Sequence, residues 1–288
     1  MRFFYFLLVC ISTLNALDIA ISSSIIPNGK TALFEFKKEK NIHYNNVVVD
    51  NKRYTILQHP VDAHKMYVLL PISYYEKPND KKVTLNYKDK NVEKNTMFFL
   101  RVEDAKYAKE TLQVDNSKVS LDKKDKKRAS LEYKEAMDIY NTSTQKSYIS
   151  SKFILPLDTK ITSEFGKARV YNDTLKGYHS GTDFRAKVGV PIKASNDGVV
   201  VLAKDRFYSG GSIVIDHGHG IYTCYFHMSK FDVEKGQRVK KAQTIGLSGD
   251  SGRVTGPHLH FSARVSGVQV DPLQLITLMN KNLFKGIE

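Results

Sequence analysis

Gly-Pro-His-Leu-His at residues 256–260 and His-Ser-Gly-Thr-Asp at residues 179–183 are the two most informative stretches of this sequence. On a strand, residues two apart point to the same face, so both histidines of the first stretch would line one surface. In the second stretch, Gly181 lets the backbone bend so that the flanking histidine and aspartate converge. Imidazoles and a carboxylate suit zinc, and three protein ligands leave a position for water. The sequence therefore predicts a zinc hydrolase.

The region around these stretches has the pattern of an antiparallel β-sheet. Short β-rich runs alternate with Asp-Gly, Gly-Gly and Ser-Gly turns, and a helical pattern begins only at Pro272. We therefore predict an antiparallel sheet domain with a groove over residues 151–280, followed by a C-terminal tail at 281–288. Its strands are expected at residues 198–202, 212–216, 222–226 and 259–263.

Residues 17–115 are predicted to form a separate β-sandwich-like domain. Short β-rich runs are separated by turn signals such as Pro-Asn-Gly and Pro-Asn-Asp, a spacing that is typical of sandwiches. No catalytic constellation is visible in this region. Its strands are expected at residues 31–36, 46–49, 66–70 and 83–87.

A helical connector is predicted over residues 116–150. The stretch is rich in Lys, Glu and Ala, and it lacks Gly and Pro. Its helix is expected to begin near Asp122. An apolar face would be formed by Leu131, Tyr133, Met137 and Tyr140.

The first 16 residues are interpreted as a signal peptide. Arg2 precedes an apolar run at residues 3–11 that is too short to span a bilayer, and small or polar residues follow it. The alternative is an uncleaved N-terminal anchor. We expect export to the periplasm and no stable membrane span after cleavage. Cleavage would leave Cys224 without a disulfide partner, and we expect this thiol to be buried as a small apolar group.

The formal net charge of +14 at pH 7 predicts attraction to polyanions. The alternative is that the lysines only keep the surface soluble. No nucleic-acid-binding module or basic motif interleaved with aromatic residues is visible, so we expect no nucleic-acid partner. An anionic cell-wall polymer remains the expected partner. The sequence does not indicate an oligomeric state.

Residues 153–275 resemble the lysostaphin-type (LytM, M23) zinc metallopeptidases, and the N-terminal β region resembles that of exported bacterial members. The resemblance implies that His179, Asp183 and His260 bind Zn²⁺, and that His227 and His258 take part in catalysis. It rests on six stretches in the family's order: residues 179–183, 194–200, 215–218, 225–229, 236–239 and 255–261.

The resemblance also implies a function. A member of this family would cut stem-peptide cross-links in peptidoglycan as a D,D-endopeptidase during cell-wall remodelling, with D,D-carboxypeptidase trimming as a second activity. Arg169 and Arg253 are candidates for binding substrate carboxylates, because arginine can grip a carboxylate with two hydrogen bonds.

Two alternatives remain open. The first is a non-catalytic wall-binding regulator of another wall hydrolase, although the intact ligand pattern argues against it. The second is an enzyme kept latent because the connector or the N-terminal domain covers the groove and places a side chain on the zinc ion.

Overall fold

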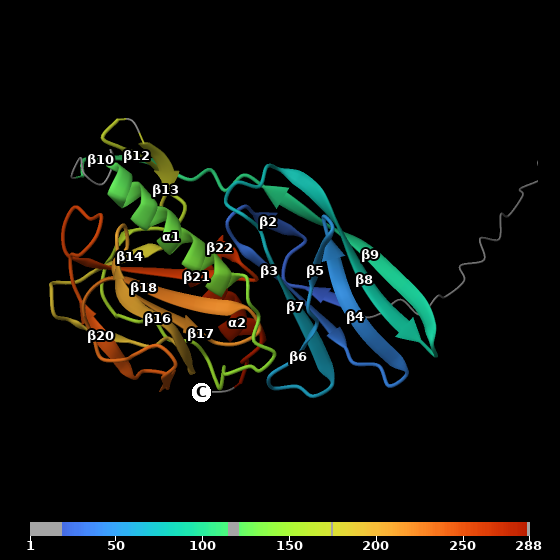
Figure 1. Cartoon of the computed structure of the whole chain (residues 1–288). Coiled ribbons are helices and arrows are strands. Elements are labelled where there is room, and N and C mark those ends of the chain that lie inside the picture. Colours follow the sequence, from blue (N-terminus) through green and yellow to red (C-terminus); the bar gives the residue numbers. More distant parts are fainter. Residues whose placement is uncertain (1–18, 115–120, 174, 287–288) are drawn as a thin grey trace, which may run out of the picture.

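The computed structural model describes residues 19–114, 121–173 and 175–286. Within these residues the protein is mainly β with two helices, as predicted, and it forms two bodies that lie side by side (Figure 1). The expected signal peptide lies outside the described residues. No described helix is both long enough and apolar enough to cross a membrane.

The N-terminal body is a sandwich of two sheets, and the inner faces of both sheets contribute to one buried cluster. The first sheet has the order β1 (Ile19–Ile21), β3 (Thr31–Lys37), β7 (Lys65–Pro71) and β6 (Leu57–Gln58). The second has the order β2 (Ile25–Pro27), β9 (Val92–Glu103), β8 (Asn79–Asp89), β4 (Ile42–Val49) and β5 (Lys52–Tyr54).

The four strands expected in this body are present as β3, β4, β7 and β8. A further strand of 12 residues, β9, was not predicted. β9 forms a hairpin with β8 through a turn in which Lys90 and Asn91 have positive φ angles. The first half of β9 is polar and exposed, so it lacks the apolar alternation that indicates a strand.

β3 and β7 are buried on both faces. On β7, Val68 and Leu70 point into the sandwich, whereas Tyr67 and Leu69 join the hydrophobic core of the C-terminal body. This explains why the β7 sequence is a nearly continuous apolar run instead of an alternating one.

The C-terminal body is built on a ten-stranded sheet. The strands expected there are present as β16, β17, β18 and β21. The main path of the sheet is β11 (Ile161–Ser163), β14 (Thr182–Arg185), β21 (His258–Val265), β18 (Ile221–Phe231), β17 (Gly210–Asp216), β16 (Gly198–Arg206) and β19 (Arg238–Val239). β15 (Pro191–Lys193), β20 (Thr244–Ser248) and β22 (Val268–Val270) pair at the sides.

Helix α1 (Lys123–Tyr140) lies across the sheet of the C-terminal body (Figure 1). Asp122 caps its first turn by accepting a hydrogen bond from the backbone N–H of Asp125. Ala136 and Tyr140 are buried against the sheet. The predicted apolar face is only partly correct, because Leu131 and Tyr133 are 60% and 66% exposed.

Helix α2 (Pro272–Asn282) joins the two bodies. Asp271 caps it and is followed by a proline, which lacks the N–H that the first helical turn leaves unpaired. The side-chain amide of Gln274 donates to the backbone carbonyl of Thr31 and accepts from its N–H, as a neighbouring strand would. Leu275 and Met279 share a buried cluster with Leu33 and Leu69 of the sandwich.

A small third sheet also connects distant parts of the chain. β10 (Lys109–Leu112) pairs in parallel with β12 (Ala168–Tyr171), which pairs with β13 (Leu175–Tyr178). After β9 the chain therefore crosses to the C-terminal body before α1 begins (Figure 1).

Because the two bodies share a core, we expect Leu69→Ala to lower the free energy of unfolding by about 2–5 kcal/mol. Urea denaturation followed by circular dichroism and tyrosine fluorescence would measure this change, since the chain has no tryptophan. The matched control is Leu131→Ala on the exposed face of α1, with an expected change within about 0.5 kcal/mol. Equal effects of the two substitutions would contradict the shared core.

Candidate metal centre

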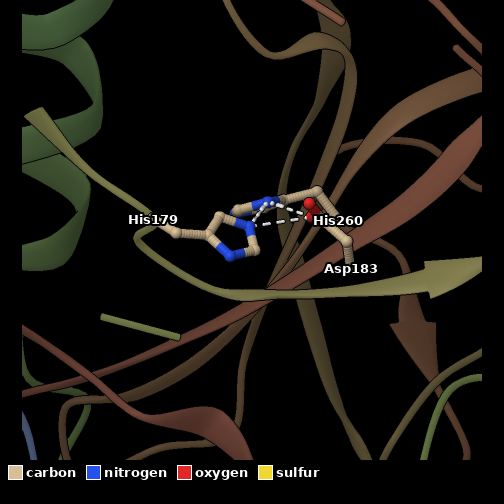
Figure 2. A group of neighbouring side chains, drawn as sticks. All are labelled: His179, Asp183 and His260. Atoms are coloured by element: carbon tan, nitrogen blue, oxygen red, sulfur yellow. Dashed lines mark hydrogen bonds and ion pairs between the residues drawn. The ribbon is translucent and has the colours of Figure 1, made fainter. Parts of the chain in front are cut away.

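Three buried side chains converge on one point (Figure 2). Nε2 of His179 lies 2.9 Å from Oδ1 of Asp183 and 3.0 Å from Nδ1 of His260. Nδ1 of His260 lies 2.9 Å from the same carboxylate oxygen. The three residues form a cluster that could hold a metal ion.

Strand register explains why these residues meet. Asp183 on β14 and His260 on β21 are Cα partners in an antiparallel pair, so their side chains leave the same face of the sheet. His179 lies just before β14. A Cβ at Gly181 would lie 2.4 Å from the carbonyl oxygen of Phe261 and 2.6 Å from Nε2 of His260. Glycine is therefore needed here because the backbone of residue 181 lies close to β21. This reason differs from the predicted one, which was a bend in the backbone.

The orientation of His179 supports a cation at this point. Its Nδ1–H donates to the backbone carbonyl of Glu164 at 2.7 Å, because a carbonyl oxygen can only accept. Nε2 of the neutral ring is then an acceptor, and it faces the acceptor oxygen of Asp183. Two acceptors this close need a proton or a cation between them. Metal-binding histidines commonly donate their other N–H to a carbonyl in this way.

Protonation states also suit a metal ion. Burial raises the pKa of the Asp183 carboxyl, but hydrogen bonds and charge interactions with His179 and His260 outweigh it and hold the pKa well below its usual range. Burial lowers the pKa of His260 to about 4, against the opposing effect of Asp183. Near neutral pH the carboxylate is ionised and the His260 ring is neutral, as metal ligation requires.

His258 and His227 lie beside this cluster. His258 is two residues before His260 on β21, and its Nε2 is 3.6 Å from Oδ1 of Asp183, so the expected shared face is present. The rings of His227 and His258 have centroids 4.8 Å apart. Their Nδ1 atoms donate to the backbone carbonyls of Ser251 and Gly256, at 2.7 and 2.8 Å, which leaves Nε2 as the acceptor in the neutral rings.

His227 occupies an unusual backbone position. Its φ is +63°, in the left-handed region that few residues other than glycine adopt, and it lies at an irregularity in the pairing of β18 with β17. The irregular backbone turns this side chain toward the cluster. Burial lowers its pKa to about 3, reinforced by His260 and His258.

A groove of about 350 Å³ opens beside the cluster. Arg253 lines it, held between two aromatic rings: its Cζ lies 4.2 Å from the ring centroid of Tyr171 and 4.5 Å from that of Tyr208. No ion pair joins Arg253 to a carboxylate within residues 19–114, 121–173 and 175–286. Its guanidinium is fixed in place with its charge uncompensated.

Arg169, the other arginine considered for substrate binding, is engaged within the protein. Its Nε donates to Oε1 of Glu110 at 2.6 Å, and its Nη2 contacts Oδ2 of Asp183 at 3.3 Å. Glu110 was not among the residues predicted for the site. It lies 59 residues before Arg169 in an exposed and charged stretch, and only the pairing of β10 with β12 brings the two residues together.

Other polar residues near these motifs have structural contacts. His217 is fully buried, donating through Nδ1 to the carbonyl of Asp197 and bonded through Nε2 to the hydroxyl of Thr223. The Cys224 thiol is buried as expected, 3.4 Å from the hydroxyl of Tyr140.

Comparison with known proteins agrees with the geometry. Residues 177–272 match the family described as Peptidase family M23. The chain is 45% identical over 122 residues to peptidoglycan DD-endopeptidase ShyA of Vibrio cholerae. The matched segment covers 41% of this chain and 28% of that protein. The chain is 37% identical over 118 residues to DD-carboxypeptidase/endopeptidase Mpg of Neisseria meningitidis, covering 41% and 27%. The matches thus span less than a third of these relatives.

A solved structure extends the likeness beyond the C-terminal body. A crystal structure of a Pseudomonas aeruginosa protein assigned to peptidase M23 matches with a TM-score of 0.66 and 24% identity. The match covers 86% of this chain and 94% of that one, so the fold is shared well beyond the C-terminal body. The resemblance drawn from the motifs is confirmed, because residues 177–272 match Peptidase family M23 and this part of the chain is similar to named peptidoglycan peptidases.

The buried His217 predicts a pH-dependent stability. Burial lowers its pKa from 6.5 to about 4, so in the window between these values the unfolded chain binds the proton more readily. Stability is therefore full above pH 6.5 and is lost as the pH falls toward 4. We expect this one group to cost about 2 kcal/mol between pH 8 and pH 5.

Urea denaturation at both pH values would measure the effect against His217→Gln, in which the titrating ring is gone. The unfolding free energy of the variant should change with pH by about 2 kcal/mol less than that of the original chain. The same pH dependence in both proteins would show that His217 does not titrate in this way.

Proposed function

We propose that this protein is a zinc-dependent peptidoglycan hydrolase that cleaves stem-peptide cross-links as a D,D-endopeptidase, with D,D-carboxypeptidase activity at the same site. The observation that carries the proposal is the cluster of His179, Asp183 and His260 with two further histidines beside it. The names of the matched relatives support the substrate class and both activities.

The ligands in this proposal are Nε2 of His179, Nδ1 of His260 and an oxygen of Asp183. Two ring nitrogens and a carboxylate oxygen are donors that zinc accepts, and three protein ligands leave room for water. When bound, the zinc ion supplies Lewis-acid activation of water and of the scissile carbonyl.

His258 and His227 are the proposed catalytic residues. Both rings donate Nδ1–H to backbone carbonyls, which leaves Nε2 as the acceptor of each neutral ring, and Nε2 of His258 lies 3.6 Å from Oδ1 of Asp183. A base in this position can take a proton from the attacking water and return it to the leaving amine. Once protonated, either Nε2–H can donate to the oxygen on which negative charge develops. The shared geometry supports a pair of histidines that divide these two tasks.

Arg253 is the proposed anchor for a substrate carboxylate. It lines the groove, and its guanidinium is fixed between two tyrosine rings. Stem peptides carry free carboxylates, which a guanidinium can bind through two hydrogen bonds. Arg169 is not available in the same way, because Glu110 and Asp183 already occupy its donors.

The proposed location is the periplasm, reached by export with cleavage of a signal peptide at residues 1–16. A substrate in the cell wall requires an exported enzyme. The net charge of +14 supports attraction to this anionic polymer.

The first test is digestion of purified cross-linked peptidoglycan with products identified by mass. We expect the full chain with zinc to convert cross-linked dimers to monomers, and His258→Ala to lower the rate by about 100- to 10,000-fold, because it removes a proton-transfer group. The variant should retain bound zinc.

The matched control is His64→Ala, which removes an exposed histidine of the N-terminal body. Its rate should equal that of the original chain. No cleavage by the zinc-loaded protein would refute the peptidase proposal and favour a wall-binding regulator.

Arg253→Met tests the carboxylate anchor. We expect KM to rise by about 10- to 100-fold with little change in kcat, since a hydrogen bond to a charged group contributes about 1.5–3 kcal/mol. Steady-state kinetics on soluble cross-linked peptides would measure the change. With a substrate whose free carboxylates are amidated, original and variant proteins should have the same KM. A KM difference that persists after amidation would argue against this role.

A further inference from the structure

A series of contacting charged side chains connects β10 with the cluster of His179, Asp183 and His260. Glu110 on β10 and Arg169 on β12 are Cα partners in a parallel strand pair. Nε of Arg169 donates to Oε1 of Glu110 at 2.6 Å. The same guanidinium contacts Oδ2 of Asp183 at 3.3 Å and Oγ of Ser163 at 3.2 Å.

The two oxygens of Asp183 thereby receive different partners. Oδ1 faces His179 and His260, whereas Oδ2 faces Arg169. A guanidinium on Oδ2 restrains rotation of the carboxylate and leaves Oδ1 as the oxygen that points at the cluster. The side chains of Arg169 and Asp183 are only 13% and 9% exposed, so water screens this contact weakly.

This arrangement creates an electrostatic difficulty that Glu110 removes. A guanidinium beside a metal site repels the metal ion, and it also attracts the carboxylate that should bind the ion. The carboxylate of Glu110 compensates that charge through Oε1, while its Oε2 lies 3.4 Å from Nζ of Lys167. Burial raises the pKa of Glu110, but its pairing with Arg169 and Lys167 outweighs this and keeps the pKa below its usual value.

We propose that Glu110 and Arg169 are positioning residues of the metal site, so that β10, which lies outside the family-matched residues 177–272, completes the site electrostatically. The inference rests on the proposed metal-binding function. Glu110 acts through Arg169 on Asp183, and neither residue belongs to the group of three side chains that could hold the metal ion.

The orientation of Glu110 argues against a role as an internal inhibitor. Both of its carboxylate oxygens face cations of the C-terminal body, and it is not part of the cluster able to hold a metal ion. In an enzyme inhibited by this residue, a Glu110 oxygen would instead lie beside the three ligand atoms, where it could bind the metal ion.

The test measures the zinc affinity of the full-length protein by competition with a fluorescent zinc chelator. We expect Glu110→Gln to weaken zinc binding by about 10- to 100-fold, as loss of partners behind a metal ligand commonly does. Arg169→Lys should also weaken it, because a lysine keeps the charge without bridging both carboxylates. In an Arg169→Met background, Glu110→Gln should have little further effect, since its path to Asp183 is gone.

The matched control is Glu135→Gln. It removes a carboxylate of α1 whose Oε2 lies 2.7 Å from Nζ of Lys204 on β16. It should leave zinc affinity unchanged. Melting temperatures of the metal-free proteins would show that all variants are folded.

Unchanged zinc affinity in both Glu110→Gln and Arg169→Lys would overturn the inference. So would unchanged affinity accompanied by faster cleavage in Glu110→Gln, which would make Glu110 an inhibitor. If the original chain binds zinc no better than His179→Ala does, the proposed metal site itself fails, an outcome that is distinct from both.

Discussion

The opposition of Asp183 and His260 across β14 and β21 is the constraint on which the candidate site depends. The register places a carboxylate and an imidazole on one face, and His258 follows on the same face two residues earlier. A shift of β21 by one residue would turn both histidines to the other side of the sheet, away from Asp183. The surrounding strands, from β11 to β19, hold that register by burying both faces of the central strands.

Backbone carbonyls also fix the orientation of three histidine rings at the site. His179, His227 and His258 each donate Nδ1–H to a carbonyl of a nearby loop, from Glu164, Ser251 and Gly256. These contacts set the tautomer, because they leave Nε2 as the acceptor of each neutral ring. The site is therefore assembled from loops as well as strands, and the positive φ of His227 is one cost of that assembly.

The sequence was sufficient for features that depend on local pattern. Strand period two predicted the shared face of His258 and His260, and the capping residue Asp122 predicted where α1 begins. Contacts between distant segments could not be read in this way. Glu110 meets Arg169 only because β10 crosses to the other body, and β7 is apolar throughout because a second body covers its outer face. The polar and exposed first half of β9 likewise concealed a long strand.

The stacked Arg253 has a consequence for the entropy of substrate binding. A free arginine side chain loses up to about 2 kcal/mol of rotamer entropy when it is immobilised. Here Tyr171 and Tyr208 hold the guanidinium before any ligand arrives. The ordering cost is thus incurred when the chain folds, and a carboxylate entering the groove meets a cation whose position is already fixed.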